Sequence, residues 1–392
     1  MSDVYIYDAV RTPRGKARPD GGLASLAPHE LVRQCIAAID ARTGGGAHEP
    51  KALLLGCVGQ VGAQGANIAL VSKLHAGLPD RAAAWTINNY CVSGLSAVGQ
   101  AAAMTRDGEG PILAGGVEML SQVPFMADKA SYYADGAFPA RTRYVPVAIA
   151  ADRLAAAVGV DRATLDAVAL DSQSRAVAAE GTPALNASRI AVIAADGAIL
   201  LDRDECIRPT SAEKLATMEP AFSELIASFS DTLAGEVVTP LHTAAHAPPM
   251  CDAAALALVG RDGAVAAKPR ARILAFADVG ADPHASLTAG YAAMDKALDR
   301  AGLTLGDMDR IEFMEAFGVT IACFLRDYPV DPTRVNVGGG HLSRGHPLGA
   351  SGAILLSTLL DALDACEGRC GLVVASGASG VGAAMVIERI GG

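Results

Sequence analysis

The chain has 392 residues, with 32 Lys and Arg against 42 Asp and Glu, which gives a formal net charge of −10. This acidic balance, without a basic stripe, argues against nucleic acid as a partner. Hydrophobic residues make up 51% of the chain and aromatic residues 4%, a composition typical of a large α/β core built from small side chains. The length exceeds one ordinary core and predicts two domains or a duplicated one.

No apolar run reaches about 18 residues, so we expect no membrane span. The N-terminus enters a strand pattern at Val4 without the features of a signal peptide. The 8 cysteines are scattered in apolar contexts, which favours reduced thiols and a cytoplasmic location. Cys366 and Cys370 could share a helix face, but no second ligand pair accompanies them, so no metal site is expected.

The predicted elements follow the same order twice along the chain. In the first part, strands are predicted over 4–10, 52–61, 84–87 and 111–114, with helices over 29–42 and 95–104. In the second part, strands are predicted over 272–279, 310–315 and 371–376, with helices over 289–301 and 348–363. This order predicts two copies of one α/β unit. Residues 119–245 do not fit the repeat and carry turn-rich pieces and a predicted helix over 164–180.

Cys91 lies in the segment 88–94 (Asn-Asn-Tyr-Cys-Val-Ser-Gly), between a predicted strand and a predicted helix. At a helix N-terminus the unpaired N–H groups and the helix dipole favour an anion, so the pKa of the Cys91 thiol is expected to fall. A nucleophile is the functional interpretation. The alternative is a buried, inert cysteine, the usual role of a lone Cys in an Ala-rich helix.

His346 lies in the glycine-rich segment 338–352, where Pro347 suits the first turn of a helix. A helix N-terminus favours neutral imidazole, which can accept a proton. The alternative is a loop histidine satisfied by backbone groups. A cysteine and a histidine on two such turns predict a nucleophile–base pair that meets only in the folded chain.

These two segments resemble the signatures of the thiolase family, Asn-x-x-Cys-x-Ser-Gly and Gly-Gly-x4-Gly-His-Pro-x-Gly-x-x-Gly. Further matching segments follow in the family's order: 10–13 (Val-Arg-Thr-Pro), 115–118 (Gly-Gly-Val-Glu), 207–209 (Ile-Arg-Pro), 315–317 (Glu-Ala-Phe) and the glycine-rich 377–382. The resemblance implies the thiolase fold, two duplicated α/β halves in five layers, α-β-α-β-α, with an inserted loop domain. On this basis residues 1–118, completed by about 246–270, form the N-terminal half, 119–245 the loop domain over coenzyme A, and 271–392 the C-terminal half.

The resemblance also implies the chemistry. The Cys91 thiolate attacks an acyl thioester while His346 takes its proton, and the acyl group passes to coenzyme A or to the carbanion of a second acyl-CoA. Coenzyme A and acyl-CoA are therefore expected as substrates, without a bound cofactor, in a homodimer or homotetramer. One oxyanion hole is expected from the backbone N–H groups of Cys91 and Ala378. The second is expected from His346 with a water held by the residue before Glu315.

Two departures from the family affect the expected catalytic residues. Met314 stands where thiolases have Asn or His to hold that water, and a thioether is a poor hydrogen-bond partner. Ser376 stands where thiolases have the acid/base cysteine, and a hydroxyl is a weak base at neutral pH.

A third departure lies in the expected coenzyme A wall, where His246 and Pro248 replace Asn and Ser. His242, His246 and His341 could compensate, with structural roles as the alternative. By resemblance, the substrate contacts are expected from Arg208, Ala244, Pro248, Ala316 and Phe317. Arg208 is expected near the adenine or a phosphate; the alternative is a surface arginine paired with Asp204 or Glu205.

The sequence therefore predicts an acyltransferase that acts on acyl-CoA thioesters through a Cys91 acyl-enzyme, by thiolysis or Claisen condensation. Two alternatives stay open because of Ser376 and Met314. One is acyl transfer to a different acceptor. The other is a catalytically impaired acyl-CoA-binding subunit, although the presence of both Cys91 and His346 argues against it.

Overall fold

The computed structural model describes residues 3–108 and 110–391, and its main sheet has ten strands. The strand order is β10-β11-β12-β9-β1-β8-β5-β3-β4, with β2 paired to β8. The N-terminal part supplies β1 (Tyr5–Arg11), β2 (Gly15–Lys16), β3 (Ala52–Gly56), β4 (Ala83–Ile87), β5 (Ile112–Met119) and β8 (Cys251–Gly260). The C-terminal part supplies β9 (Ala271–Gly280), β10 (Arg310–Phe313), β11 (Cys370–Ser376) and β12 (Val381–Arg389). The two sets join where Tyr5 and Ile6 of β1 pair with Arg272 and Ala271 of β9.

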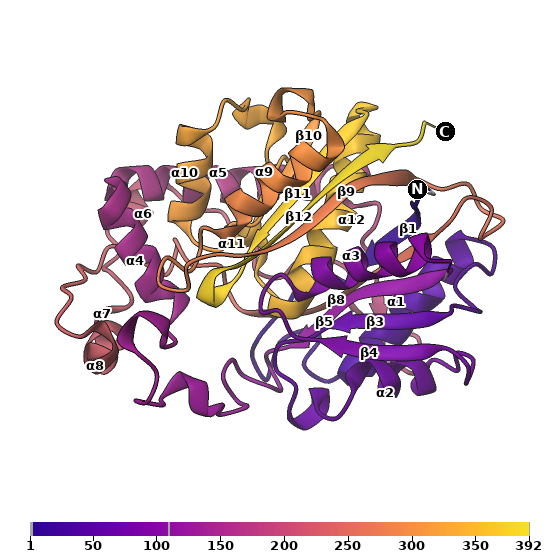
Figure 1. The fold of residues 1–392 in the computed structure, drawn as a ribbon, viewed down its shortest axis with the longest axis horizontal. Helices are drawn as coiled ribbons and strands as arrows, with labels where there is room; N and C mark the ends of the chain where they lie inside the picture. The colour runs from indigo at the N-terminus through magenta and orange to yellow at the C-terminus, as the bar shows by residue number, and fades with distance from the viewer. Residues whose placement is uncertain (1–2, 109, 392) are drawn as a thin grey trace.

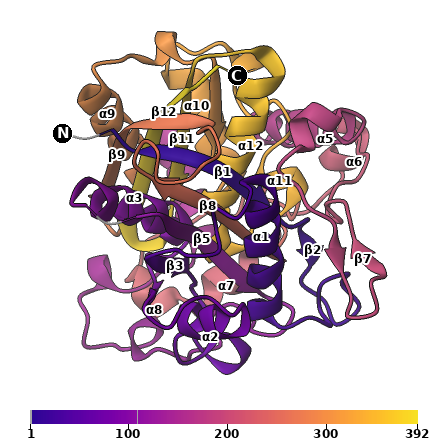
Figure 2. The same cartoon turned by 90° about the vertical axis from the view of Figure 1, so that its right-hand side faces the viewer.

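Helices divide the structure into five layers, as predicted (Figures 1 and 2). The middle layer holds α3 (Ser93–Arg106) and α12 (Ser351–Cys366), which contact each other and strands of both halves. One outer layer holds α1 (Pro28–Arg42) and α2 (Ile68–His75), packed on the N-terminal strands. The other holds α9 (Ala289–Ala301), packed on β9 and β12. Because helices cover both faces of the sheets, β8 is buried along its whole length.

The segment between β5 and β8 forms a separate group of helices and one short hairpin beside the layers (Figure 1). It contains α4 (Val147–Val158), α5 (Arg162–Glu180), α6 (Ala212–Ala216), α7 (Ser223–Ser228), α8 (Ser230–Leu233) and the hairpin of β6 (Val192–Ile193) and β7 (Ile199–Leu201). In the C-terminal half, α10 (Gly318–Asp327) and α11 (His341–Arg344) pack against α5.

Several predicted boundaries are wrong for identifiable reasons. The strand predicted over 52–61 ends at Gly56, because the N–H groups of Val58 and Gly59 turn toward the carboxylate of Glu118. The strand predicted over 111–114 continues to Met119, since Gly115 and Gly116 pair with both β3 and β8. The helix predicted from 348 begins with a 3-10 turn, Leu348–Ala350.

The structure separates Cys366 and Cys370, which end α12 and begin β11, so they do not share a helix face. Among the described residues, no group of three or more His, Cys, Asp or Glu side chains is placed to hold a metal ion. The stretch Leu348–Cys366 is long and apolar enough for a membrane span, but 83% of its 18-residue apolar part is buried inside the protein. It is a core helix.

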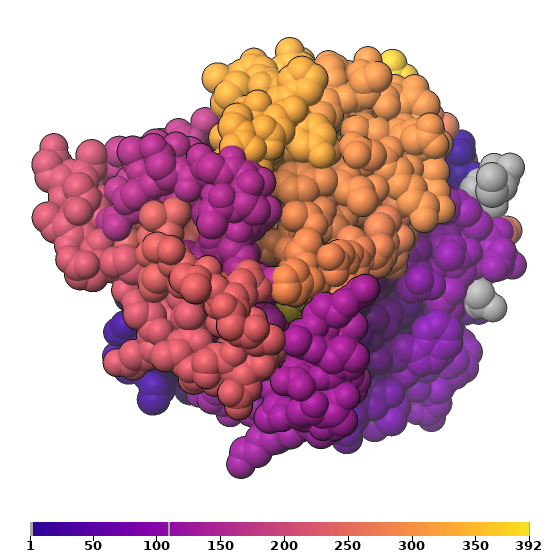
Figure 3. Space-filling view, turned by 60° about the vertical axis from the view of Figure 1, so that its left-hand side comes forward, coloured from indigo at the N-terminus to yellow at the C-terminus, as the bar shows by residue number. Residues whose placement is uncertain are grey.

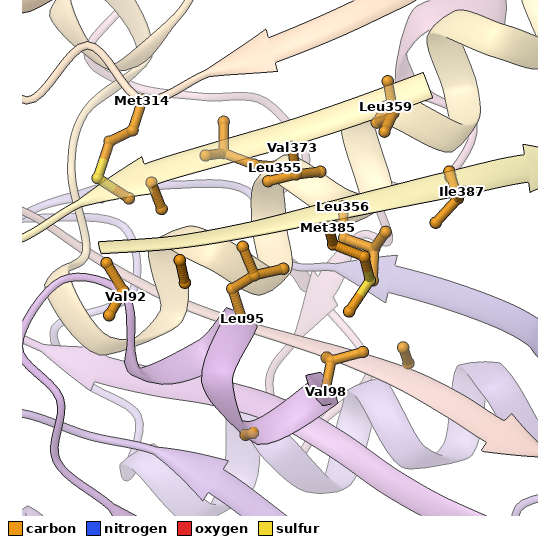
Figure 4. Close-up of a cluster of buried hydrophobic side chains, with 14 of the residues drawn as sticks. Val92, Leu95, Val98, Met314, Leu355, Leu356, Leu359, Val373, Met385 and Ile387 are labelled. Atoms are coloured by element: carbon orange, nitrogen blue, oxygen red, sulfur yellow. The ribbon is translucent and has the colours of Figure 1, made fainter. Parts of the chain in front are cut away.

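The middle layer is a dense apolar core between the two halves. In Figure 4, Leu95 and Val98 of α3 face Leu355 and Leu356 of α12 and Met385 of β12. These side chains are fully or almost fully buried. The packing fixes the position of α3 relative to α12.

Glycines allow the first turns of α3 and α12 to touch. A Cβ atom added at Gly352 would lie 2.6 Å from the Cβ atom of Leu95, and one added at Gly94 would lie 2.7 Å from the carbonyl oxygen of Gly349. A Cβ atom at Gly116 of β5 would lie 2.3 Å from the same oxygen. We call this group of contacts the α3–α12 contact; it leaves no room for a side chain.

We predict that Gly352→Ala lowers the free energy of unfolding by about 1–3 kcal/mol, because the new methyl group must displace Leu95. Helix propensity alone would raise the free energy of unfolding by up to ~1 kcal/mol, so the sign of the change distinguishes the two effects. Urea denaturation measures this free energy. Gly136→Ala is the control, since nothing lies within 4 Å of its added Cβ atom. A Gly352→Ala protein as stable as the parent would contradict the packing argument.

Candidate active site

One cavity, of about 290 Å³, brings together residues from both halves and from the segment between them. Cys91, His346, Ser376 and Ala378 all line it. The surface is hollowed where the magenta, salmon and orange parts of the chain meet (Figure 3). The remaining lining is almost entirely apolar: Val58, Tyr90, Phe125, Pro146, Val147, Ala148, Phe222, Leu225, Ala247, Pro248, Met250, Leu287, Ala316, Phe317, Leu348 and Gly377.

Cys91 sits on a tight turn between β4 and α3, two residues before the first helical residue. The preceding Tyr90 has a φ of 48°, in the left-handed region that non-glycine residues rarely adopt. Ser93 holds the turn, because its Oγ accepts from the Asn89 N–H at 2.7 Å and donates to the Tyr90 carbonyl. The turn thus presents Cys91 to the cavity in a fixed, strained position.

The prediction that the pKa of Cys91 falls is wrong. Burial, with the charge of Glu118 as a second cause, raises the pKa of the Cys91 thiol to about 12. The backbone N–H groups of Cys91 itself and of Ala378 lie within hydrogen-bond reach of the thiol and act in the opposite direction. Desolvation outweighs the helix terminus here, because Cys91 precedes the helix and faces an apolar cavity. The resting residue is therefore a neutral thiol.

His346 is neutral as well, as the sequence predicts. Burial, assisted by the nearby charge of Arg14, lowers the pKa of its imidazole to about 3. Its Nδ1 lies 2.8 Å from Ser351 Oγ, and its backbone N–H donates to the Pro249 carbonyl at 2.7 Å. With Nδ1 engaged by Ser351, Nε2 is the nitrogen left to exchange a proton.

Ser376 lines the cavity at the end of β11. Its Oγ accepts the backbone N–H of Gly290, in the first turn of α9, at 3.1 Å. A Cβ atom at position 290 would come within 2.3 Å of this oxygen, so the contact requires glycine.

The backbone N–H of Ala378 lies within hydrogen-bond reach of the Cys91 thiol. It begins a 3-10 turn, Ala378–Gly380, in which Ser379 has a φ of 56°. The Ser379 N–H donates to Ser286 Oγ at 3.0 Å, which anchors the turn. The N–H groups of Ala378 and Cys91 therefore converge beside the thiol.

The structure does not bring Met314 and Glu315 into the cavity lining. Met314 is 1% exposed and lies in the buried apolar cluster with Val92 and Leu355 (Figure 4). The Glu315 carboxylate instead accepts hydrogen bonds from Ser172 Oγ of α5 at 2.8 Å and from the Leu342 N–H, in the segment before His346, at 3.0 Å. Glu315 therefore positions the loop that leads to His346.

The expected substrate contacts divide into two groups. Pro248, Ala316 and Phe317 line the cavity, whereas Ala244 is exposed outside it. Arg208 is exposed and lines a different, polar cavity of about 390 Å³ with Lys16, Arg18, Glu205 and Met250. Met250 lines both cavities, so the two are neighbours.

Asp204 is not paired with Arg208 as the alternative interpretation had it. Its carboxylate bonds Arg11 at 2.8 Å and Arg344 at 2.7 Å, with all three side chains buried. The neighbouring Arg14 is also buried and donates to the Gly345 carbonyl at 3.2 Å. This network holds the residues just before His346, and it was not predicted from the sequence. The one feature of the sequence that indicates it is the presence of arginines in two segments that are otherwise apolar or rich in glycine.

The three histidines that could have compensated, His242, His246 and His341, do not line the cavity. His242 Nδ1 lies 2.6 Å from Asp152, and His246 Nε2 lies 2.8 Å from Asp166. His341 packs its ring against that of His346, with the ring centroids 5.1 Å apart, and neither of its nitrogens has a partner among the described residues. Sequence reasoning also missed most of the apolar lining, notably Phe125, Phe222 and Leu225.

Comparisons with known proteins agree with this geometry. The N-terminal thiolase domain model matches residues 4–261, and the C-terminal thiolase domain model matches residues 267–389. An acetyl-CoA acetyltransferase of Paracoccus denitrificans is 34% identical, with 99% of this chain and 100% of that protein covered. A beta-ketoadipyl-CoA thiolase of Acinetobacter baylyi is also 34% identical, with both chains covered in full (100%).

Among solved structures, the Bacillus anthracis acetyl-CoA acetyltransferase superimposes with a TM-score of 0.85 at 27% identity. The match covers 100% of this chain and 99% of that one. The fold, the two domain models and the full-length relatives lead to one conclusion: this chain belongs to the thiolase family.

Proposed function

We propose that this protein transfers acyl groups from acyl-CoA thioesters through an acyl-enzyme at Cys91, as an acetyl-CoA C-acyltransferase working by thiolysis or Claisen condensation. The observation that carries the proposal is the meeting of Cys91 and His346 in one apolar cavity, with two backbone N–H groups directed at the thiol. A nucleophile, a neutral base and an oxyanion hole are the parts that acyl transfer requires.

In the proposed acylation, the Cys91 sulfur bonds to the thioester carbonyl carbon while its proton moves to His346 Nε2. The N–H groups of Cys91 and Ala378 stabilise the oxyanion that develops; one such donor typically contributes about 3 kcal/mol. The bond from the carbonyl carbon to the coenzyme A sulfur then breaks, and the departing thiolate takes the proton from His346. When Nδ1–H donates to Ser351 Oγ, Nε2 is the nitrogen free to accept the proton.

The test is intact-mass analysis of the protein mixed with acetyl-CoA. We predict a mass increase of one acetyl group on the parent protein, mapped to Cys91, and none on Cys91→Ala. His346→Ala should acylate about 10²–10⁴-fold more slowly, the usual contribution of a general base. Acetylation that maps to another residue, or its absence in the parent, would refute the proposal.

The step that exchanges a proton with the substrate α-carbon is less well equipped. In condensation this proton leaves the second acyl-CoA, and in thiolysis a proton is added to the carbanion that C–C cleavage releases. We assign this transfer to Ser376, which lines the cavity. Its hydroxyl is a weak acid and base at neutral pH. With Met314 in the core, no side chain at that position contributes a hydrogen bond to the cavity. These two observations favour acyl transfer to a different acceptor as the second candidate function.

We predict that Ser376→Cys raises the rate of 3-ketoacyl-CoA thiolysis more than the rate of Cys91 acylation. A thiol titrates much closer to neutral pH than a hydroxyl, and the two side chains differ by one atom. Single-turnover acylation and steady-state thiolysis of the two proteins give the comparison, with Ser376→Ala as the control. Fast thiolysis by the parent protein, unchanged in Ser376→Ala, would show that another group carries the proton.

A further inference from the structure

The cavity around Cys91 is lined by two groups of apolar residues. One group is Val147, Phe222, Leu225 and Phe317. The other group is Val58, Tyr90, Phe125 and Leu348, and we call it the inner wall. Cys91 packs directly against the inner wall in one apolar cluster.

The inner wall suits the acyl group. Under the proposed function, the acyl group bonded to the Cys91 sulfur starts beside this wall, because Cys91 and Phe125 pack on the same cluster as Val58 and Leu348. Val58 and Leu348 are nearly fully buried, at 6% and 4% exposure, and Phe125 packs on them. A chain that leaves Cys91 on this side therefore meets hydrocarbon.

The charge of the cavity lining bears on the acyl group that it can hold. Among the residues that line the cavity, the described structure places no Lys, Arg, Asp or Glu. The hydrogen-bonding side chains are those of Tyr90, Cys91, His346 and Ser376. His346 carries no charge at neutral pH, because burial lowers the pKa of its imidazole. A carboxylate at the end of an acyl chain would be buried here without a cation.

We propose that the acyl group carried by Cys91 is uncharged and apolar, lies against Val58, Phe125 and Leu348, and is preferred over acyl groups that end in a carboxylate. This inference rests on the proposed acyl-enzyme and narrows its substrate class. Each methylene buried on the inner wall contributes about 0.8 kcal/mol, or about fourfold in rate, until the wall is filled. A buried, unpaired carboxylate costs at least about 100-fold.

Hexanoyl-CoA and adipoyl-CoA test the inference, because their acyl chains have equal length and differ by a terminal carboxylate. Single-turnover acylation of Cys91, followed by intact mass, gives a second-order rate constant for each, with acetyl-CoA as reference. We expect hexanoyl-CoA to react faster than acetyl-CoA and at least about 100-fold faster than adipoyl-CoA. Equal rates for hexanoyl-CoA and adipoyl-CoA would overturn the inference.

A cation placed on the inner wall provides the matched variant. Phe125→Lys should narrow the hexanoyl-to-adipoyl ratio by at least about tenfold, since the new ammonium can pair with the terminal carboxylate. Phe125→Met keeps an apolar side chain and should retain the parent ratio. If both variants shift the ratio equally, the acyl chain does not lie against Phe125. The comparison on the parent protein stands even if Phe125→Lys folds poorly.

The two hypotheses fail in different ways. Acetylation of Cys91 with no preference for hexanoyl-CoA would leave the acyl-enzyme intact and remove only the inference about the inner wall. If none of the three thioesters acylates Cys91, the proposed function itself is wrong.

Discussion

The close approach of α3 and α12 is the constraint on which the active site depends. Each helix begins just after a functional turn, Cys91 before α3 and His346 before α12. Glycines at 94, 116 and 352 let backbone meet backbone, with no room for even a methyl group. Cys91 and His346 lie 255 residues apart in the sequence (346 − 91), so tertiary contacts such as this one are needed to bring nucleophile and base to one cavity. The duplicated architecture thus creates the site at the junction of its two copies.

Buried carboxylates keep the two turns in place. Glu118 accepts hydrogen bonds at 2.9 Å from the N–H groups of Val58, Gly59 and Gly349, and so ties the cysteine half to the loop that carries His346. Glu315 and Asp204 hold the residues before His346 from the other side. Such groups are costly to bury, and each is satisfied by several donors, which favours one rigid arrangement. Desolvation also keeps Cys91 and His346 uncharged at neutral pH, because it raises the pKa of the thiol and lowers that of the imidazole.

Much of the fold was predictable from the sequence, because hydrophobic periodicity and the repeated order of elements survive in the structure. The helix predicted over 289–301 agrees with α9 at both ends. Cys91 and His346 were singled out on turns that precede predicted helices, and Ser376 and Ala378 by resemblance to the thiolase family; all four line one cavity. Their convergence on one cavity could not be derived from spacing alone.

The predictions that were wrong depended on burial or on packing between segments far apart in the sequence. The pKa of Cys91 rises because apolar residues from several segments surround it, and a local argument about the helix terminus does not include them. Met314 follows a strand and was expected to belong to the active site, but its side chain lies in the apolar core between the halves. The apolar lining, including Phe125 and Phe222, comes from loops without regular periodicity, so it carried no signal.

The central claim is that a neutral thiol and a neutral imidazole react together at the α3–α12 contact. The pH dependence of single-turnover acylation, measured for the parent and for His346→Ala, tests it most directly. With the pKa of His346 lowered to about 3, the base stays unprotonated from pH 5 to 8, so the parent rate should be flat there. Without the base, attack needs preformed thiolate; with the pKa of Cys91 raised to about 12, the variant rate should climb about tenfold per pH unit. A parent rate that falls below pH 6.5, as for an ordinary imidazole, or a variant with the parent's profile, would contradict the account.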